Sequence, residues 1–584
     1  MFTSHSLLPQ DSHDPQQLLE AINADGPPDP QLIDKAAQAH SRSGDERWLM
    51  PWALGLWRLG RHAEALAVTD RAAGPLLANA DFLTVRGMVA RQCEGHRETA
   101  LQAYRQALAV DPQRADAHYN LANLLMDEQP EQAEQHYRQS LVLAPGDAQV
   151  WHNLGITLNN LSRYGEAIDA LKRSLRLQPG VADVWCNLGL AHQGQGRFEP
   201  AMAAFRQAIG LDPNHAASHI NMGNALVCCL EPEQALVYLE RGQQLADSSA
   251  NSLWNLALAH LLLGNFAQGW RYYEARFATA AFDAVEPPSA GPQPASLAAC
   301  PRAGEPPLLV WSEQGMGDAI QFGRYLPMLE AAGIPYEFRC RPPLLRLFRQ
   351  WLRLGEQVQP ETLRTDADDR RPQCPLLSLP RLFGTELETV PSVLPYFQAP
   401  ESPPPHLQVS PPPGGLAVGI VWAASADNRQ MYRHKSMPLA LLMPRLLDLL
   451  DLDLIDVHAL QVGPDAPQLD PWRSHPRIID WAPRLNDFAD TAHVVSQLDL
   501  VISVDTAVAH LAGALNRPCW VLLPRNPDFR WLRHRADSPW YPGCMRLFRQ
   551  ADHGDWFSVV HQVKAAFDAL FLFDVDALAA AKLH

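Results

Sequence analysis

The chain has 584 residues, of which 47% are hydrophobic and 19% charged, and this composition describes a folded protein of several domains. Lys and Arg number 48 against 64 Asp and Glu, so the net charge of −16 disfavours a nucleic-acid binder. The sequence shows neither a membrane-spanning apolar stretch nor a secretory signal, and its nine cysteines form no CxxC pair. We therefore expect a large cytoplasmic protein without disulfides.

A helical repeat fills the first half of the chain. Prolines recur at spacings of 33, 34 and 34 residues, each preceded by a small residue and then a ring or Leu. This pattern resembles the tetratricopeptide repeat, in which two antiparallel helices cross at small residues and a proline ends the second. The resemblance implies an α-solenoid over residues 47–284, after a helical cap at 1–46. The recurring residues are Pro112, Pro145, Pro179 and Pro213, then Ala100, Ala133, Ala167, Ala201 and Ala235, then Tyr104, Tyr137, Leu171, Phe205 and Leu239.

One place in the repeat indicates a binding role. An asparagine takes the sixth place of five successive units, although Asn is only a middling helix former. A carboxamide can hydrogen-bond the backbone of an extended peptide without reading its side chains, whereas the alternative is that these residues merely hydrate the surface. The sequence is similar here to O-linked N-acetylglucosamine transferases, whose asparagine ladder holds acceptor polypeptides. The candidate acceptor-binding residues are Asn120, Asn153, Asn187, Asn221 and Asn255.

Two proline-rich segments, 285–306 and 401–414, are interpreted as semi-rigid spacers because proline cannot complete helix or sheet hydrogen bonds. Each precedes an apolar run that leads to a polar turn and a helix, which is the parallel α/β pattern. The predicted fold class is an α-solenoid followed by two Rossmann-like domains, 307–400 and 415–584, facing a cleft. The expected strands are 308–311, 336–340, 416–423, 453–461, 499–503 and 519–523, and the expected helices are 318–333, 506–515 and 556–573, the last packed on the first α/β domain.

The first candidate motif, GMGDAIQFGRYLP (315–327), directly follows a predicted strand. Gly315 and Gly317 permit a tight turn and close approach of the backbone to a ligand. Asp318 falls at the start of a helix, where it is either a helix cap or a functional carboxylate. The third glycine of GxGxxG is missing, since position 320 is Ile, and this argues against a dinucleotide-binding enzyme.

Two further motifs follow strands of the second α/β domain. In VDTAVAHLAGAL (504–515), Thr506 and Ala507 start a helix whose N-terminus can hold an anion, with Asp505 before it and His510 one turn along. The alternative is a capped packing helix. In NRQMYRHKSMPL (428–439), Arg433 and Lys435 either neutralise a leaving diphosphate or belong to an exposed charged loop.

Together these motifs and DSPWYPGCMRLFRQ (537–550) resemble bacterial GT-B glycosyltransferases of the heptosyltransferase-like class, specifically those fused behind tetratricopeptide repeats and including candidate flagellin glycosyltransferases. The resemblance implies that Asp318 acts as the base on the acceptor hydroxyl, and that Asp505, Thr506, Ala507 and His510 hold the donor's phosphates and sugar. Lys435, three residues before Pro438, matches the pyrophosphate lysine of O-linked N-acetylglucosamine transferases.

The resulting hypothesis is an inverting, metal-independent transfer of a sugar from a nucleotide-sugar to Ser or Thr of a protein, with flagellin as a candidate acceptor. No cofactor is expected. Two Asp-x-Asp strings are the only hints of a metal, Asp366 with Asp368 and Asp451 with Asp453, and neither is interpreted as a site. The alternatives are a repeat-based adaptor with a degenerate transferase domain, and a transferase for a lipid or polysaccharide acceptor.

Overall fold

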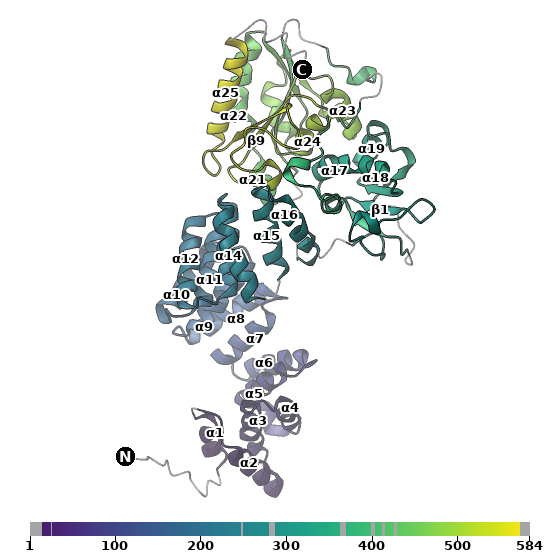
Figure 1. Cartoon of the computed structure of the whole chain (residues 1–584). Coiled ribbons are helices and arrows are strands. Elements are labelled where there is room, and N and C mark those ends of the chain that lie inside the picture. The colour runs from purple at the N-terminus through teal and green to yellow at the C-terminus, as the bar shows by residue number, and fades with distance from the viewer. Residues whose placement is uncertain are drawn as a thin grey trace. The chain divides into compact units, whose positions relative to one another are not determined.

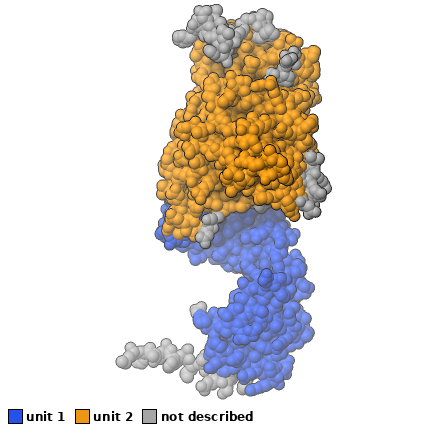
Figure 2. Space-filling view, turned by 45° about the vertical axis from the view of Figure 1, so that its right-hand side comes forward, with its two compact units in different colours: residues 1–225 blue, residues 226–584 orange. Residues whose placement is uncertain are grey.

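The computed structural model of the chain describes residues 14–24, 26–246, 249–279, 286–362, 369–398, 403–410, 415–425 and 429–572. They form two compact units, Met1–Ala225 and Leu226–His584, which divide within one helix (Figures 1 and 2). The second unit therefore contains the last repeat helices together with every strand of the described residues.

The first unit is built of helices alone in its described residues (Figure 1). Consecutive helices pair as antiparallel hairpins, and the predicted repeat is confirmed. The helices are α1 (Pro15–Asn23), α2 (Pro30–Ser43), α3 (Leu49–Arg58), α4 (His62–Thr69), α5 (Ala80–Arg91), α6 (Arg97–Val110), α7 (Ala115–Leu125), α8 (Pro130–Leu143), α9 (Ala148–Asn160), α10 (Tyr164–Leu177), α11 (Ala182–Gly194), α12 (Phe198–Leu211) and α13 (Ala216–Cys228), which crosses the boundary.

Glycines in the first helix of a repeat make room for the large side chain of the second. A Cβ on Gly155 would lie 2.5 Å from Leu171, and one on Gly189 would lie 2.4 Å from the Phe205 ring. Such distances are far inside van der Waals contact, so the two helices can cross this closely only where the first helix has no side chain. The recurring bulky residue of the sequence pattern therefore packs against a glycine of the preceding helix, a position that the pattern did not include.

A hydrogen bond that the sequence analysis did not identify joins neighbouring repeats. Nε1 of Trp151 donates to the carbonyl of Pro145 at 3.0 Å, and Nε1 of Trp185 donates to that of Pro179 at 3.2 Å. The same place holds histidine in two other repeats, and the carbonyl again accepts from a ring nitrogen six residues later. These pairs are His118 with Pro112 at 3.1 Å and His219 with Pro213 at 3.0 Å.

The second unit begins with α14 (Pro232–Leu245), α15 (Ala250–Leu262) and α16 (Phe266–Tyr273) and continues as two parallel sheets with helices around them (Figure 1). The first sheet region contains β1 (Leu308–Trp311), α17 (Met316–Phe322), α18 (Leu326–Ala331), β2 (Tyr336–Cys340), α19 (Leu345–Trp351), β3 (Val358–Pro360), β4 (Gln373–Pro375) and α20 (Leu379–Leu382). The second contains β5 (Leu416–Val421), α21 (Arg429–Lys435), α22 (Leu439–Asp451), β6 (Ile455–Ala459), β7 (Ile478–Asp480), α23 (Phe488–Val495), β8 (Leu500–Val504), α24 (Ala507–Ala514), β9 (Cys519–Leu523), β10 (Met545–Arg549) and α25 (Trp556–Leu572).

The strand orders are β3-β2-β1-β4 and β10-β9-β8-β5-β6-β7, and every pairing is parallel. The second sheet has the doubly wound Rossmann order, and the first has its beginning, so the predicted fold class is confirmed. The strand order reverses beside β1 in the first sheet and between β5 and β8 in the second. Ligands of such sheets bind at the carboxyl ends of the strands at this reversal.

The predicted packing of the last helix is wrong. Helix α25 lies on the second sheet, where the Phe567 ring packs 4.7 Å from Trp520 of β9 and Val559 and Val563 join the same core. The error has a simple cause, because an apolar helix face does not reveal which of two sheets it covers. Four strands also escaped the sequence analysis, namely β3, β4 and β7, of three residues each, and β10, of five.

The proline-rich segment before the first sheet is packed against it. Over its described residues, the Ser289 hydroxyl donates to the carbonyl of Arg371 at 2.8 Å, and the Pro292 carbonyl accepts from Gln373 of β4 at 3.1 Å. Proline lacks an N–H but retains a carbonyl acceptor, so the segment can still bind along a strand. It is held to the sheet rather than free as a spacer.

Candidate active site

Two predicted residues meet at the reversal point of the second sheet. Lys435 ends α21, after β5, and Asp505 follows β8. Nζ of Lys435 lies 2.6 Å from Oδ2 of Asp505, and the two side chains are 15% and 2% exposed. Burial alone would raise the pKa of Asp505, but Lys435, His510 and Arg530 outweigh it and lower that pKa to about 2. A buried, ionised Lys–Asp pair therefore occupies the position at which sheets of this kind bind their ligands.

His510 stands behind this pair on α24. Its Nε2 is 3.9 Å from Asp505 Oδ1, its Nδ1 is 3.0 Å from the Tyr541 hydroxyl, and its ring stacks on Trp531. Burial, with Arg530 nearby, lowers the pKa of His510 to about 3. The ring is therefore neutral at physiological pH, and it can form hydrogen bonds but carries no charge to a phosphate.

Asp318 reaches the same place from the first sheet. Oδ1 of Asp318 lies 2.5 Å from Nη2 of Arg530, a residue in the turn after β9, and Oδ2 accepts the backbone N–H of Gly315 at 2.9 Å. Asp528 is the second partner of Arg530, with Oδ2 3.0 Å from Nη1. Burial raises the pKa of Asp528, and Arg530 and Lys435 offset this only in part. One network of charges thus joins the two sheets.

The glycines and the helix start have local roles. A Cβ on Gly317 would lie 3.0 Å from His510 Cδ2 and 3.3 Å from the Cα of Ala507, so this glycine lets α17 approach α24. Thr506 is the N-cap residue of α24, but its hydroxyl pairs with that of Ser503 at 2.8 Å and does not cap the helix. Thr506 and Ala507 are half-buried beside the charged cluster.

The last repeat helix forms part of the site's support. Tyr273 of α16 accepts a hydrogen bond at its hydroxyl from Gln314, at 2.9 Å, just before the glycine loop. Trp270 is 1% exposed and packs edge-on against Phe322 of α17 and Phe529, the neighbour of Asp528. Helix α17 and the turn after β9, which carry the Asp318–Arg530 pair, are therefore both contacted by one repeat helix.

Two charged residues of this network were not identified by the sequence analysis, and one candidate residue does not join the network. Asp528 and Arg530 follow β9 in NPDFRW (526–531), and a charged pair after a parallel strand was the available signal. Arg433 is exposed, and no ion pair of it is found within the described ranges. Asp366 and Asp368 lie outside the described residues.

No group of three or more potential metal-binding side chains occurs in the part of the chain that the structure describes. The string Asp451 and Asp453 is exposed, and these residues face His475 and Arg477 rather than each other.

The asparagines of the repeats differ in their surroundings. Asn153 Nδ2 donates to Asn123 on the preceding first helix at 2.8 Å, Asn187 Nδ2 lies 3.0 Å from His152 Nε2, and Asn120 Nδ2 donates to its own helix at 2.9 Å. Asn221 is also half-buried and contacts the Cys186 sulfur, at 3.4 Å. Asn255, in the second unit, is buried with 6% exposure. Four of the five therefore keep a partly exposed carboxamide, all in the first unit.

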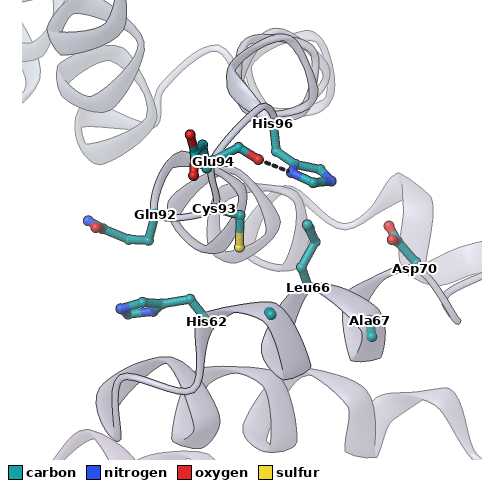
Figure 3. Close-up of a pocket in the computed structure, with 9 residues that line it drawn as sticks. His62, Leu66, Ala67, Asp70, Gln92, Cys93, Glu94 and His96 are labelled. Atoms are coloured by element: carbon teal, nitrogen blue, oxygen red, sulfur yellow. Dashed lines mark hydrogen bonds between the residues drawn. The ribbon is translucent and has the colours of Figure 1, made fainter.

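Pockets also occur in the first unit, away from the charged cluster. One of about 460 Å³ lies between α4 and the loop after α5, where His62, Cys93 and His96 line it with Glu94 and Asp70 (Figure 3). Its one drawn hydrogen bond, from His96 Nδ1 to the Glu94 carbonyl, is local. Another of about 370 Å³ is lined by Trp151, Arg173 and Arg176 among others. Neither contains a predicted site residue.

Family comparisons agree with this division of the chain. Models of the tetratricopeptide repeat match residues 94–129, 136–169 and 182–215. The model of Glycosyltransferase family 9 (heptosyltransferase) matches residues 473–523, the range that contains Asp505 and His510. The matches support tetratricopeptide repeats fused to a glycosyltransferase domain.

The chain is also similar to Protein FlbA of Caulobacter vibrioides (strain ATCC 19089 / CIP 103742 / CB 15), with 26% identity over 507 residues, which are 82% of each chain. Among solved structures, one described as "Functional Characterization of Pseudomonas Aeruginosa pilF" is 25% identical and covers 35% of this chain and 95% of its own, with a TM-score of 0.31. YrrB, a TPR protein with an unusual peptide-binding site, is 22% identical over 33% of this chain and 95% of its own, with a TM-score of 0.27.

None of the described helices combines the length and apolarity that crossing a membrane requires.

Proposed function

We propose that the chain is an inverting glycosyltransferase that moves a sugar from a nucleotide-sugar to a Ser or Thr hydroxyl of a protein. The observation that carries the proposal is the convergence of Asp318 from one sheet with Lys435, Asp505 and Arg530 from the other, at the carboxyl ends of the strands. A donor bound to the second sheet would there meet a carboxylate from the first.

In the proposed reaction, the acceptor oxygen attacks the anomeric carbon as Asp318 takes the hydroxyl proton. The new C–O bond forms on the face opposite the leaving group, and the bond from the anomeric carbon to the phosphate oxygen breaks. The nucleotide departs with the electron pair, which inverts the anomeric centre. Asp318 is suited to this role because it is a carboxylate on the opposite sheet from the donor groups.

Donor binding is assigned to the second sheet. Lys435 and Arg530 supply positive charge, the start of α24 at Thr506 and Ala507 supplies backbone N–H groups, and Asp505 and neutral His510 are polar partners for sugar hydroxyls. Exposed Arg433 lies on the same helix as Lys435 and remains a candidate phosphate ligand. Two cations and a helix start can stabilise a leaving phosphate without a metal ion, so activity is expected to survive excess chelator, and loss that Mn²⁺ restores would contradict this part of the proposal.

The acceptor is proposed to be a protein held by the repeats, with flagellin as the candidate that the sequence resemblance suggests. The partly exposed carboxamides of Asn120, Asn153, Asn187 and Asn221 are proposed to bind its backbone. Changing three of them to Ala should weaken acceptor binding and leave nucleotide binding intact, and unchanged acceptor affinity would exclude the ladder. The proposed compartment is the cytoplasm, which suits a chain whose nine cysteines are thiols rather than disulfides.

The experiment that tests the function is a thermal-shift panel of the full chain with UDP, GDP, ADP, CMP and CDP. A ligand at 100 times its Kd adds about 2.7 kcal/mol to the stability of the unit that binds it. We expect a shift with one nucleotide that is lost in Asp505→Ala/His510→Ala. A chain that responds to none of the five would instead be interpreted as a repeat-based adaptor.

A further inference from the structure

Arg530 forms an ion pair with the candidate base, Asp318. Both oxygens of Asp318 are engaged, one by Arg530 Nη2 at 2.5 Å and the other by the Gly315 N–H at 2.9 Å. An acceptor hydroxyl that approaches Asp318 must therefore displace one of these two donors, and the guanidinium forms the stronger, charge-assisted bond. While the pair is closed, Asp318 is not available to an acceptor hydroxyl.

Arg530 can leave Asp318 without leaving the site. Its Nη1 also pairs with Asp528 at 3.0 Å, and its backbone N–H donates to the same carboxylate at 3.2 Å, so Asp528 is a second anchor in the same turn. Its Nε is buried and has no hydrogen-bond partner within the described residues. The side chain, 6% exposed, thus retains an unused donor inside the cluster.

The anion most able to displace Asp318 from Arg530 is a phosphate. A guanidinium binds phosphate through two parallel hydrogen bonds, and Arg530 follows β9, next to β8 and its ligand-binding edge. Arg530 lies close to both Lys435 and Asp505 at that edge, because its charge helps to lower the pKa of Asp505 and opposes the protonation of Lys435. Asp505 in turn helps to raise the pKa of Arg530. A nucleotide phosphate bound beside Lys435 would therefore lie within reach of Arg530.

We propose that Arg530 is a positioning residue that couples the two substrates: the donor's phosphate takes Arg530 away from Asp318, and Asp318 then becomes free to accept the acceptor's proton. The proposal rests on the function proposed above. It makes the donor the first substrate to bind, because the base is available only after the phosphate has replaced it on Arg530.

The test is the affinity of the full chain for phosphate-bearing probes, by isothermal titration calorimetry with UDP, GDP, ADP, CMP, CDP and inorganic pyrophosphate. In Asp318→Asn the phosphate no longer competes with a carboxylate for Arg530, so Kd should fall about three- to tenfold although the base is gone. In Arg530→Gln it should rise about tenfold or more, and adding Asp318→Asn to that variant should change nothing further.

Asp456→Asn is the matched control. Asp456 forms a 2.5 Å ion pair with Arg477 in the same unit, and its loss should leave every Kd unchanged. An Asp318→Asn chain that binds the probe no more tightly than wild type would overturn the coupling and leave the proposed function standing. If no probe binds the wild-type chain, the proposed function itself fails and the coupling with it. The Asp318→Asn arm decides the matter even if Arg530→Gln does not fold, because Asn keeps the shape of the aspartate.

Discussion

Removing the cation of the buried Lys–Asp pair should destabilise the second unit strongly. In Lys435→Met the side-chain length is kept, but Asp505, 2% exposed, loses the cation 2.6 Å away. Breaking a buried pair by removing one partner costs about 3–5 kcal/mol, because the remaining charge is left uncompensated. Arg530 also lowers the pKa of Asp505 and remains in the variant, so we expect the lower end, about 3 kcal/mol.

Hydrogen-exchange mass spectrometry of strand β8 measures this loss in the full chain without requiring both units to unfold together. A loss of about 3 kcal/mol should make its globally protected amides exchange about a hundredfold faster. The double variant Lys435→Met/Asp505→Asn removes the stranded charge and should recover most of the loss.

Lys564→Met is the control, since Lys564 pairs with Asp568 at 2.7 Å but is 51% exposed. An exposed pair contributes about 0–1 kcal/mol, so exchange should barely change. Equal exchange rates in Lys435→Met and wild type would refute the reasoning, because they would mean that Asp505 is not a buried charge that depends on Lys435.

Three further predictions concern stability. Burial lowers the pKa of His510 to about 3 and that of His458 to about 4. The stability that these neutral rings contribute is therefore complete above their unfolded-state pKa of about 6.5, and it falls as the pH drops below that value, by up to about 1.4 kcal/mol per pH unit for each. A melting temperature that stays constant from pH 7.5 to 5.5 would contradict this. Trp151→Phe removes the N–H that donates to the Pro145 carbonyl and should lower the free energy of unfolding of the first unit by about 1 kcal/mol, measured by urea denaturation. Trp185→Phe, in the next repeat, should have the same effect, and no loss in either variant would refute the role of this bond. Trp270→Ala should cost the second unit about 3–5 kcal/mol, and a wild-type melting curve would show that α16 is not part of its core.

The sequence predicted the architecture because its signals are periodic or local. The repeat spacing reflects a contact that recurs in several repeats, as between Gly155 and Leu171 and between Gly189 and Phe205. A continuous apolar run such as 416–423 is what a buried parallel strand requires. Short strands such as β7, three residues long, carry too few residues for such a pattern. Which of the two sheets α25 covers depends on tertiary packing, and the sequence of the helix alone does not determine it.

The candidate site was predicted in part for the same reason. Lys435 and Asp505 could be placed at strand ends, but their pairing depends on the strand order, which sets β5 beside β8. Arg530 and its bond to Asp318 link positions 212 residues apart on different sheets, and only the packing of the two sheets brings them together. The role of α16 as a brace is equally invisible in the sequence, because Trp270 and Tyr273 read there as ordinary repeat residues.

The most direct test of the central claim needs no knowledge of the donor. Proteins that co-purify with the full chain from its native cells are compared by intact-mass and peptide mass spectrometry between cells carrying wild type and cells carrying Asp318→Asn. The account predicts a sugar mass on Ser or Thr of at least one co-purified protein with the wild-type chain, and its absence with Asp318→Asn. The same sugar mass in both, or in neither, would contradict a protein glycosyltransferase that uses Asp318 as its base.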